Sequence, residues 1–321
     1  MSRANRRIVL TGVGVVTSIG MDAASYWKGL VEGQCGIKRI SLFDPSSLEV
    51  QIAGEITSFD PKPYLSKEGR KQIRVMARPI QHAVVAAQLA LDDAKVDKTK
   101  IDPTRFGTEF GAGLIPSELT ELADASAVAM QGGRTEPDLK AWGEKGIPVI
   151  QPLWMLKYLP NMLACHVSIL HNSQGPNNSI TQSDVGGVLA LGEAVRILRR
   201  DQADLFFVGS ADSKIMPLSM VRQSIFKHLS PRNDQPTKAL KPFDKNRDGM
   251  VLGEGGCVFI AEDLDHAQKR GAPIYAEVVG FGAAFDRGMT GAGLARAIHV
   301  ALAQAGITPA DVDHVNTHGI G

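Results

Sequence analysis

The sequence is poor in cysteine, in aromatic residues and in net charge. Its three cysteines among 321 residues are too few and too widely spaced for a disulfide framework or a cysteine-based zinc site, which favours a reducing compartment. A net charge of +1 gives no electrostatic reason to expect nucleic acid or an acidic membrane as a partner. No apolar run is long enough to cross a bilayer. We therefore expect a cytoplasmic protein without membrane or nucleic-acid contacts.

Glycine is abundant, at 33 residues, and apolar segments alternate regularly along the chain. The first apolar stretch is short and broken by glycine, which indicates a buried strand and not a signal peptide. Strands are predicted at 6–16, 106–113, 203–211, 256–263, 275–283 and 313–319. Helices are predicted at 22–32, 74–93, 116–130, 185–200, 264–270 and 291–305. This alternation predicts an α/β layered fold with mainly parallel strand pairing.

The segment NNSITQSDVGG (177–187) carries the most informative local pattern. A short alternating strand runs into a sharp turn, and a helical pattern begins at Val185. A side chain at the tip of such a turn faces whatever binds there, and the helix amides behind it favour negative charge. This position commonly holds a nucleophilic Cys or Ser. Here the tip is Ser183-Asp184.

Several blocks along the chain carry a family resemblance. They are PNMLACHVSI (160–169), GPNNSI (175–180), GEAVRIL (192–198), LSPRND (229–234), KPFDKNRDGMVLGEGG (241–256) and HVNTHG (314–319). In this order they resemble the β-ketoacyl-ACP synthases of the thiolase-like condensing-enzyme family. Comparing the blocks without gaps places Asp184 where the family has its catalytic Cys.

The resemblance implies a thiolase-like layered αβαβα fold with two related halves. Residues 1–255 would form the N-terminal half, which carries the nucleophile turn. Residues 256–321 would begin the C-terminal half, truncated after its first His block, so the second half would be incomplete. A strand ending in a glycine-broken turn occurs both in RRIVLTGVGVVTSIG (6–20) and in AEVVGFGAAF (276–285), which fits such a duplication.

The resemblance also implies a reaction. In the family, a Cys thiolate accepts the acyl chain as a thioester, two His residues assist decarboxylation of the malonyl thioester, and backbone N–H groups form an oxyanion hole. No metal or resident cofactor is required, because phosphopantetheine arrives on the acyl carrier protein. His318 matches the first catalytic His, whereas the second His and the C-terminal Gly-rich loop have no counterpart before Gly321. The family acts as a dimer, so a homodimer or a heterodimer is expected.

Asp184 is a poor substitute for a thiolate. Carboxylate attack on a thioester would give a mixed anhydride of higher energy, and the negative charge would oppose a malonyl substrate. The simplest interpretation is that Asp184 caps the following helix, a contribution of about 1 kcal/mol. The alternatives are a new acid/base role or an anion that repels carboxylated substrates. Ser183 is a further nucleophile candidate, but it lies one position away and the sequence assigns no base to it.

Two functions follow from these observations. The first is a 3-oxoacyl-ACP synthase that condenses acyl and malonyl thioesters in fatty acid or polyketide biosynthesis. The second is a non-catalytic partner subunit, similar to the chain-length factors of polyketide systems, that completes a dimer with a Cys-bearing ketosynthase. A decarboxylase ranks lower, because decarboxylation in the family uses both histidines.

The long segment 132–159 contains Trp142, Trp154 and Tyr158. These aromatic residues either reshape the mouth of the substrate pocket or anchor a surface loop, and the second interpretation is preferred.

Two further motifs are weak. Cys165 and His166 are adjacent on a predicted helix, where neighbouring side chains point in different directions, so we interpret both as packing residues. DKNRDGMVLGEG (244–255) imitates a calcium loop, but Glu254 is its eleventh residue and not the twelfth that an EF-hand requires. We therefore predict no metal site.

Overall fold

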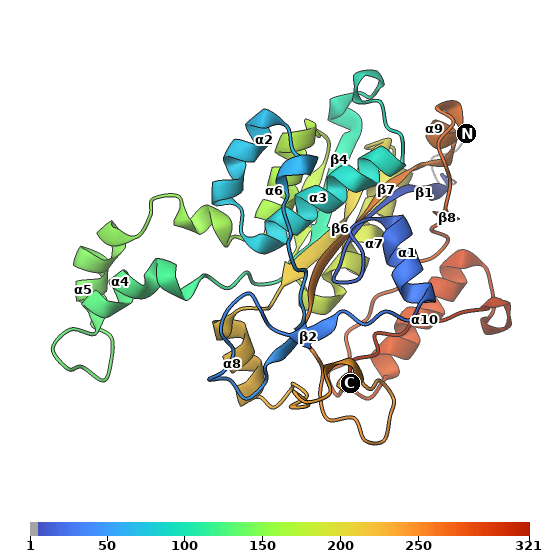
Figure 1. Cartoon of the computed structure of the whole chain (residues 1–321). Helices are drawn as coiled ribbons and strands as arrows, with labels where there is room; N and C mark the ends of the chain where they lie inside the picture. The colour runs from blue at the N-terminus through green and yellow to red at the C-terminus, as the bar shows by residue number, and fades with distance from the viewer. Residues whose placement is uncertain (1–5) are drawn as a thin grey trace.

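A six-stranded sheet forms the centre of the structure, a computed structural model that describes residues 6–321 (Figure 1). Its order is β5-β4-β6-β7-β1-β8. The strands are β1 (Ile8–Val16), β4 (Phe106–Gly111), β5 (Asn177–Ile180), β6 (Leu205–Ser213), β7 (Glu254–Asp263) and β8 (Ala276–Glu277). A separate two-stranded sheet pairs β2 (Ile37–Arg39) with β3 (Ile52–Gly54).

The predicted parallel pairing holds only around β4. This strand is parallel to β5 and to β6, whereas β6 with β7, β7 with β1 and β1 with β8 are antiparallel. The prediction of a mainly parallel sheet was therefore wrong. The reason is the connection 214–253, which returns the chain to the end of the sheet where β6 finishes, so that Ser213 pairs with Glu254. Parallel pairing would require a crossover to the opposite end.

The six helices predicted from the sequence are all present. Beside them, α6 was expected only from the resemblance, and α2, α5 and α8 were missed. The helices are α1 (Ala23–Val31), α2 (Lys67–Gln72), α3 (Arg78–Asp93), α4 (Leu119–Ala129), α5 (Leu139–Ala141), α6 (Met162–His171), α7 (Gly186–Arg199), α8 (Pro217–Ile225), α9 (Leu264–Lys269) and α10 (Ala292–Ala305). No helix within residues 6–321 is both long enough and apolar enough to cross a bilayer.

Both faces of the main sheet are covered by helices. In β6, the side chains of Leu205 and Phe207 pack into the core formed with α3 and α6. The intervening Phe206 and Val208 pack into the core formed with α7. Because successive side chains of a strand point to opposite faces, a strand buried on both faces has an almost uninterrupted apolar sequence. This explains why the strand predictions for β4, β6 and β7 succeeded.

One close contact between a glycine and the backbone of a helix occurs twice. A Cβ atom added at Gly14 of β1 would lie 1.8 Å from the carbonyl oxygen of Ala86 in α3. A Cβ atom added at Gly282 would lie 1.9 Å from the carbonyl oxygen of Ala297 in α10. Only glycine permits this backbone approach. The sequence similarity between the two glycine-broken segments thus corresponds to the same glycine-to-helix backbone contact in two places.

The C-terminal part adds layers beyond α7. The ring of Phe281 lies against Gly192 of α7, and the same segment, 278–283, meets α10 on its other side. The order of contact is therefore α3 and α6, the sheet, α7, segment 278–283 and α10, as in a thiolase-like layered fold. Two strand predictions were nevertheless wrong. The strand expected at 275–283 is reduced to β8, whose two residues pair with β1. Segment 313–319 forms no strand, and within residues 6–321 no strand pairs with it.

The close approach at Gly14 gives a first prediction. Gly14→Ala should lower the free energy of unfolding by roughly 1–3 kcal/mol, because the new methyl group must displace helix backbone. Gly143→Ala is the matched control, since nothing lies within 4 Å of a Cβ at that position. Urea denaturation of both variants measures the difference. Equal stability of Gly14→Ala and the parent chain would contradict the packing described here.

Buried Glu109 in β4 gives a second prediction. Its carboxylate is fully buried, and neither oxygen has a hydrogen-bond partner in the described part of the chain. Burial, aided by the charge of Glu193 and opposed by the nearby Asn178 side chain, raises the pKa of Glu109 to about 7. The folded protein therefore keeps this proton at pH values where the unfolded chain has already released it. As a result, the free energy of unfolding falls as the pH rises towards 7.

Glu109→Gln removes that titration. We expect the melting temperature of the parent chain, relative to Glu109→Gln, to fall between about pH 5 and about pH 8. Thermal unfolding followed by circular dichroism across this range measures the effect. Parallel pH profiles for the two proteins would show that Glu109 does not titrate as described.

Candidate active site

The strand-to-helix turn predicted from the sequence is present at the head of α7. β5 ends at Ile180, a short 3₁₀ turn covers Ser183–Val185, and α7 begins at Gly186. The turn is seated on β4, because a Cβ atom added at Gly111 would lie 2.1 Å from the backbone of Gly186. This contact places Ser183 and Asp184 beyond the carboxyl end of the parallel strands, a frequent location for chemistry in α/β folds.

Asp184 does not cap α7. The N-cap position is occupied by Val185 with φ −95° and ψ −4°, and no side chain caps the helix. A capping residue usually has an extended backbone before the helix, whereas Asp184 lies inside the 3₁₀ turn and its side chain is 73% exposed. Its carboxylate accepts a hydrogen bond from Ser183 Oγ at 3.3 Å. The capping interpretation was therefore wrong.

Ser183 has the strained backbone of this turn. Its φ is +46°, in the left-handed region that side chains other than glycine rarely adopt. Such residues occur at active sites and sharp turns, where surrounding structure holds them in place. The sequence assigned no base to Ser183, but in the structure its hydroxyl group lies beside the Asp184 carboxylate.

His318 lies next to Asp184, as its match to the family's first catalytic His predicts. Its Nε2 atom is 3.9 Å from Asp184 Oδ2, and the two side chains are 62% and 73% exposed. The residues are far apart in sequence, and the C-terminal segment brings them together by resting on the loop before β7, where Gly321 meets Gly249. The structure thus gathers Ser183, Asp184 and His318, the three residues selected from the sequence.

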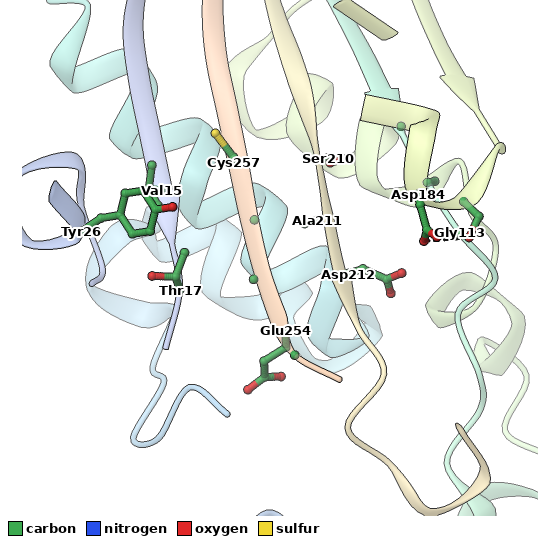
Figure 2. A pocket seen from close by; sticks show the side chains of 16 residues that line it. Val15, Thr17, Tyr26, Gly113, Asp184, Ser210, Ala211, Asp212, Glu254 and Cys257 are labelled. Carbon is green, nitrogen blue, oxygen red and sulfur yellow. Dashed lines mark hydrogen bonds between the residues drawn. The ribbon is translucent and has the colours of Figure 1, made fainter. Parts of the chain in front are cut away.

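A cavity of about 490 Å³ opens beside this turn (Figure 2). Figure 2 shows Asp184 and Asp212 on one side and Thr17, Tyr26 and Cys257 on the other. The remaining lining is rich in backbone atoms, because glycines within or next to β4 and β7 contribute to it. They are Gly111, Gly113, Gly253, Gly255 and Gly256.

Cys257 is a thiol that sequence reasoning did not place near the site. It lies in β7 and lines the cavity. Burial raises the pKa of Cys257 to about 11, so the thiol is protonated near neutral pH and is a poor nucleophile. Strand alternation within β7 would have been the signal for its position, once the register with β6 was known.

Glu254 lines the cavity and links three neighbouring segments by hydrogen bonds. Its buried carboxylate accepts hydrogen bonds from Arg78 Nε at 2.5 Å, Ser213 Oγ at 2.8 Å and the Ile56 backbone N–H at 2.8 Å. Burial alone would raise the pKa of Glu254, but the hydrogen bonds and charge of Arg78 outweigh it and the pKa is lowered. A carboxylate satisfied in this way holds structure together and is not free for chemistry.

A larger cavity, of about 790 Å³, shares Ser183, Asp184 and Asp212 with the first. Its other charged lining residues are mostly basic, although Asp248 also contributes. The basic residues are Lys214, Arg222, Lys227 and Arg247. This arrangement is suited to an anionic group that approaches Asp184 from outside.

The aromatic residues of segment 132–159 do not reach either cavity. Trp142, Trp154 and Tyr158 are absent from both linings. The rings of Trp154 and Tyr158 pack at 5.4 Å, and Tyr158 donates a hydrogen bond to Glu121. Figure 1 shows α4 and α5 projecting away from the sheet in this region. The interpretation as a surface segment anchored by aromatic residues is confirmed, and His166 of α6 is buried as expected for a packing residue.

The family model of the β-ketoacyl synthase N-terminal domain matches residues 5–266, and the model of the β-ketoacyl synthase C-terminal domain matches residues 275–321. The chain belongs to the β-ketoacyl synthase family. Its ketosynthase relatives are proteins of fatty acid or polyketide biosynthesis, and this chain is a member of that group.

Individual relatives agree with the family assignment. The chain is 35% identical, over 98% of its length and 73% of the relative, to 3-oxoacyl-[acyl-carrier-protein] synthase 2 of Vibrio cholerae. Among solved structures, the ishigamide ketosynthase/chain length factor matches with TM-score 0.82 and 27% identity, covering 98% of this chain and 74% of that one. A type II PKS acyl-carrier protein in complex with its ketosynthase bound to the hexaketide matches with TM-score 0.76 and 25% identity, covering 98% and 73%.

The position of Asp184 gives a third prediction. Asp184→Asn should change the free energy of unfolding by at most about 0.5 kcal/mol, because the side chain is exposed and caps nothing. Asp22→Ala is the contrast, because Asp22 caps α1 by accepting a hydrogen bond from the Ser25 N–H at 2.7 Å, and its loss should cost about 1 kcal/mol. Chemical denaturation compares the two. A larger loss for Asp184→Asn than for Asp22→Ala would restore the capping role.

Proposed function

We propose that this ketosynthase-family chain is a non-elongating subunit that acts beside a Cys-bearing ketosynthase, in the cytoplasm, on acyl chains borne by an acyl carrier protein. The observation that carries the proposal is the turn at the head of α7. It presents the exposed carboxylate of Asp184, with His318 at 3.9 Å, at the position where the resemblance places a catalytic Cys.

The chemistry of this turn opposes acyl-enzyme formation. A carboxylate that attacks a thioester yields an anhydride, which is higher in energy than its precursor and is readily hydrolysed. The negative charge also disfavours a malonyl carboxylate and a developing enolate nearby. Cys257 does not offer a substitute, since burial raises its pKa to about 11. A condensing cycle therefore has no nucleophile of the usual kind at this site.

The larger cavity supports contact with a carrier protein. Its lining carries four basic side chains and three carboxylates, and Lys214 is paired with Asp212 at 3.0 Å. Arg222, Lys227 and Arg247 are the cations that remain to attract an anionic group towards Asp184. Phosphopantetheine carries a phosphate diester, which Lys and Arg bind well, and a positive surface also attracts an acidic carrier. A resident cofactor is not part of the proposal, because the pantetheine arm arrives on the carrier.

Two surface features support a protein partner. β5 is an edge strand that pairs only with β4 within residues 6–321, so one side of it is open to another strand. The projecting segment that carries α4 and α5 returns to the body just before α6 and β5, and it exposes many large apolar side chains. These are Leu119, Leu139, Ile147, Val149, Leu153 and Met155. Exposed apolar groups of this kind mark interaction surfaces. A homodimer, the other assembly that the resemblance implies, would use the same surface.

A second candidate function has one specific observation in its favour. Ser183 combines a strained backbone with a hydroxyl group beside the Asp184 carboxylate. In this alternative, Ser183 Oγ attacks the thioester carbonyl and its proton passes to Asp184. The carbon–sulfur bond breaks, and the pantetheine thiolate takes a proton from solvent. The product would be an acyl ester on Ser183, and the chain would be an acyltransferase in its own right.

The fourth prediction separates these functions. The parent chain, Asp184→Cys and Ser183→Ala are each incubated with an acyl-ACP and analysed by intact-protein mass spectrometry. We expect no adduct on the parent chain and a thioester adduct on Asp184→Cys, because the thiol then occupies the head of α7. An adduct on the parent chain that disappears in Ser183→Ala would instead support the second candidate. A parent chain that extends acyl chains when supplied with malonyl-ACP would contradict the proposal.

A further inference from the structure

A small cavity lies at the opposite end of the sheet from Asp184. It measures about 150 Å³ and is bounded by the start of β4, the end of α6 and the turn at 98–103. Because β4 and β5 are parallel, the amino end of β4 and the turn that follows the carboxyl end of β5 lie at opposite ends of the strands. The lining residues are Lys98, Ile101, Pro103, Phe106, Leu170, His171 and Asn172. None of them lines either cavity beside Asp184.

His171 is the buried polar side chain of this cavity. The residue is 5% exposed, and its Nδ1 atom has no hydrogen-bond partner in the described residues. Its ring packs on Phe207 at a centroid distance of 4.8 Å. Burial, followed by the positive charge of Lys98, lowers the pKa of His171 to about 3, so the imidazole is neutral. A buried polar group without a partner is uncommon in native proteins, and a bound ligand is one explanation.

The rest of the lining defines the ligand. Ile101, Phe106 and Leu170 provide an apolar wall, whereas Lys98 is an exposed cation at the edge. The nearby carboxylates of Asp97 and Asp102 are engaged by Thr99 and Thr104 in their own turns, and neither lines the cavity. An apolar cavity of about 150 Å³ is large enough for a benzene-sized molecule.

We propose that this cavity binds a short-chain monocarboxylate. The alkyl chain would pack against the apolar wall, His171 would donate a hydrogen bond to a carboxylate oxygen, and Lys98 would neutralise the charge at the solvent edge. The site is independent of the function proposed for Asp184, and it adds a binding activity for a small acid to the far side of the sheet.

The fifth prediction uses n-butyrate as the probe on the full chain. Isothermal titration or a two-dimensional NMR titration should show one saturable site, and 1-butanol, which has the same chain without the charge, should bind at least about fivefold more weakly. Lys98→Gln should weaken butyrate binding by a similar factor. His171→Phe, which keeps an aromatic ring on Phe207, should abolish binding. Lys100→Gln, a neighbouring lysine outside the lining, should leave the affinity unchanged.

Three results would overturn the proposal. They are the absence of saturable butyrate binding, equal affinity for 1-butanol, and an affinity that Lys98→Gln and Lys100→Gln change equally. Lys98→Gln is a surface substitution, so the test stands even where His171→Phe perturbs the core.

Discussion

The backbone contact between β4 and the first turn of α7 is the constraint on which the site depends. Gly111 and Gly186 approach so closely that a single Cβ atom at Gly111 would overlap the helix backbone. This contact fixes where α7 begins, and so it fixes the strained turn at Ser183 and the position of Asp184. The same device, glycine against helix backbone, joins β1 to α3 and segment 278–283 to α10. Glycine contacts therefore set both the layers and the site.

On this scaffold, the site presents charge in place of a nucleophilic thiol. Asp184 is exposed and faces His318, and basic side chains line the approach from the larger cavity. Cys257 lies across the cavity, is half-buried, and stays protonated at neutral pH. Such a site suits binding or orientation of a carrier-borne acyl chain better than covalent capture of it. The open edge of β5 and the exposed apolar side chains of the segment that carries α4 and α5 are the surfaces on which the proposed partner would dock.

The sequence predicted the site better than it predicted the sheet. Ser183, Asp184 and His318 were selected because their flanking blocks keep a family order, and the structure brings them together. The capping role of Asp184 was wrong because backbone geometry at one residue cannot be read from residue type. The strand β7 was predicted, but its antiparallel direction was missed, because local periodicity does not show where a long connection returns to the sheet. The cavity position of Cys257 likewise depends on register, which is set by tertiary contacts.

Reconstitution with a Cys-bearing ketosynthase of the same family tests the central claim most directly. Such a ketosynthase is mixed with this chain, acyl-ACP and malonyl-ACP, and the products and the assembly are measured together by mass spectrometry and size-exclusion chromatography. The account predicts a stable complex whose product chain length differs from that of the ketosynthase alone, with no elongation by this chain alone. Elongation by the isolated chain, or a mixture in which the two proteins neither associate nor alter the products, would contradict it.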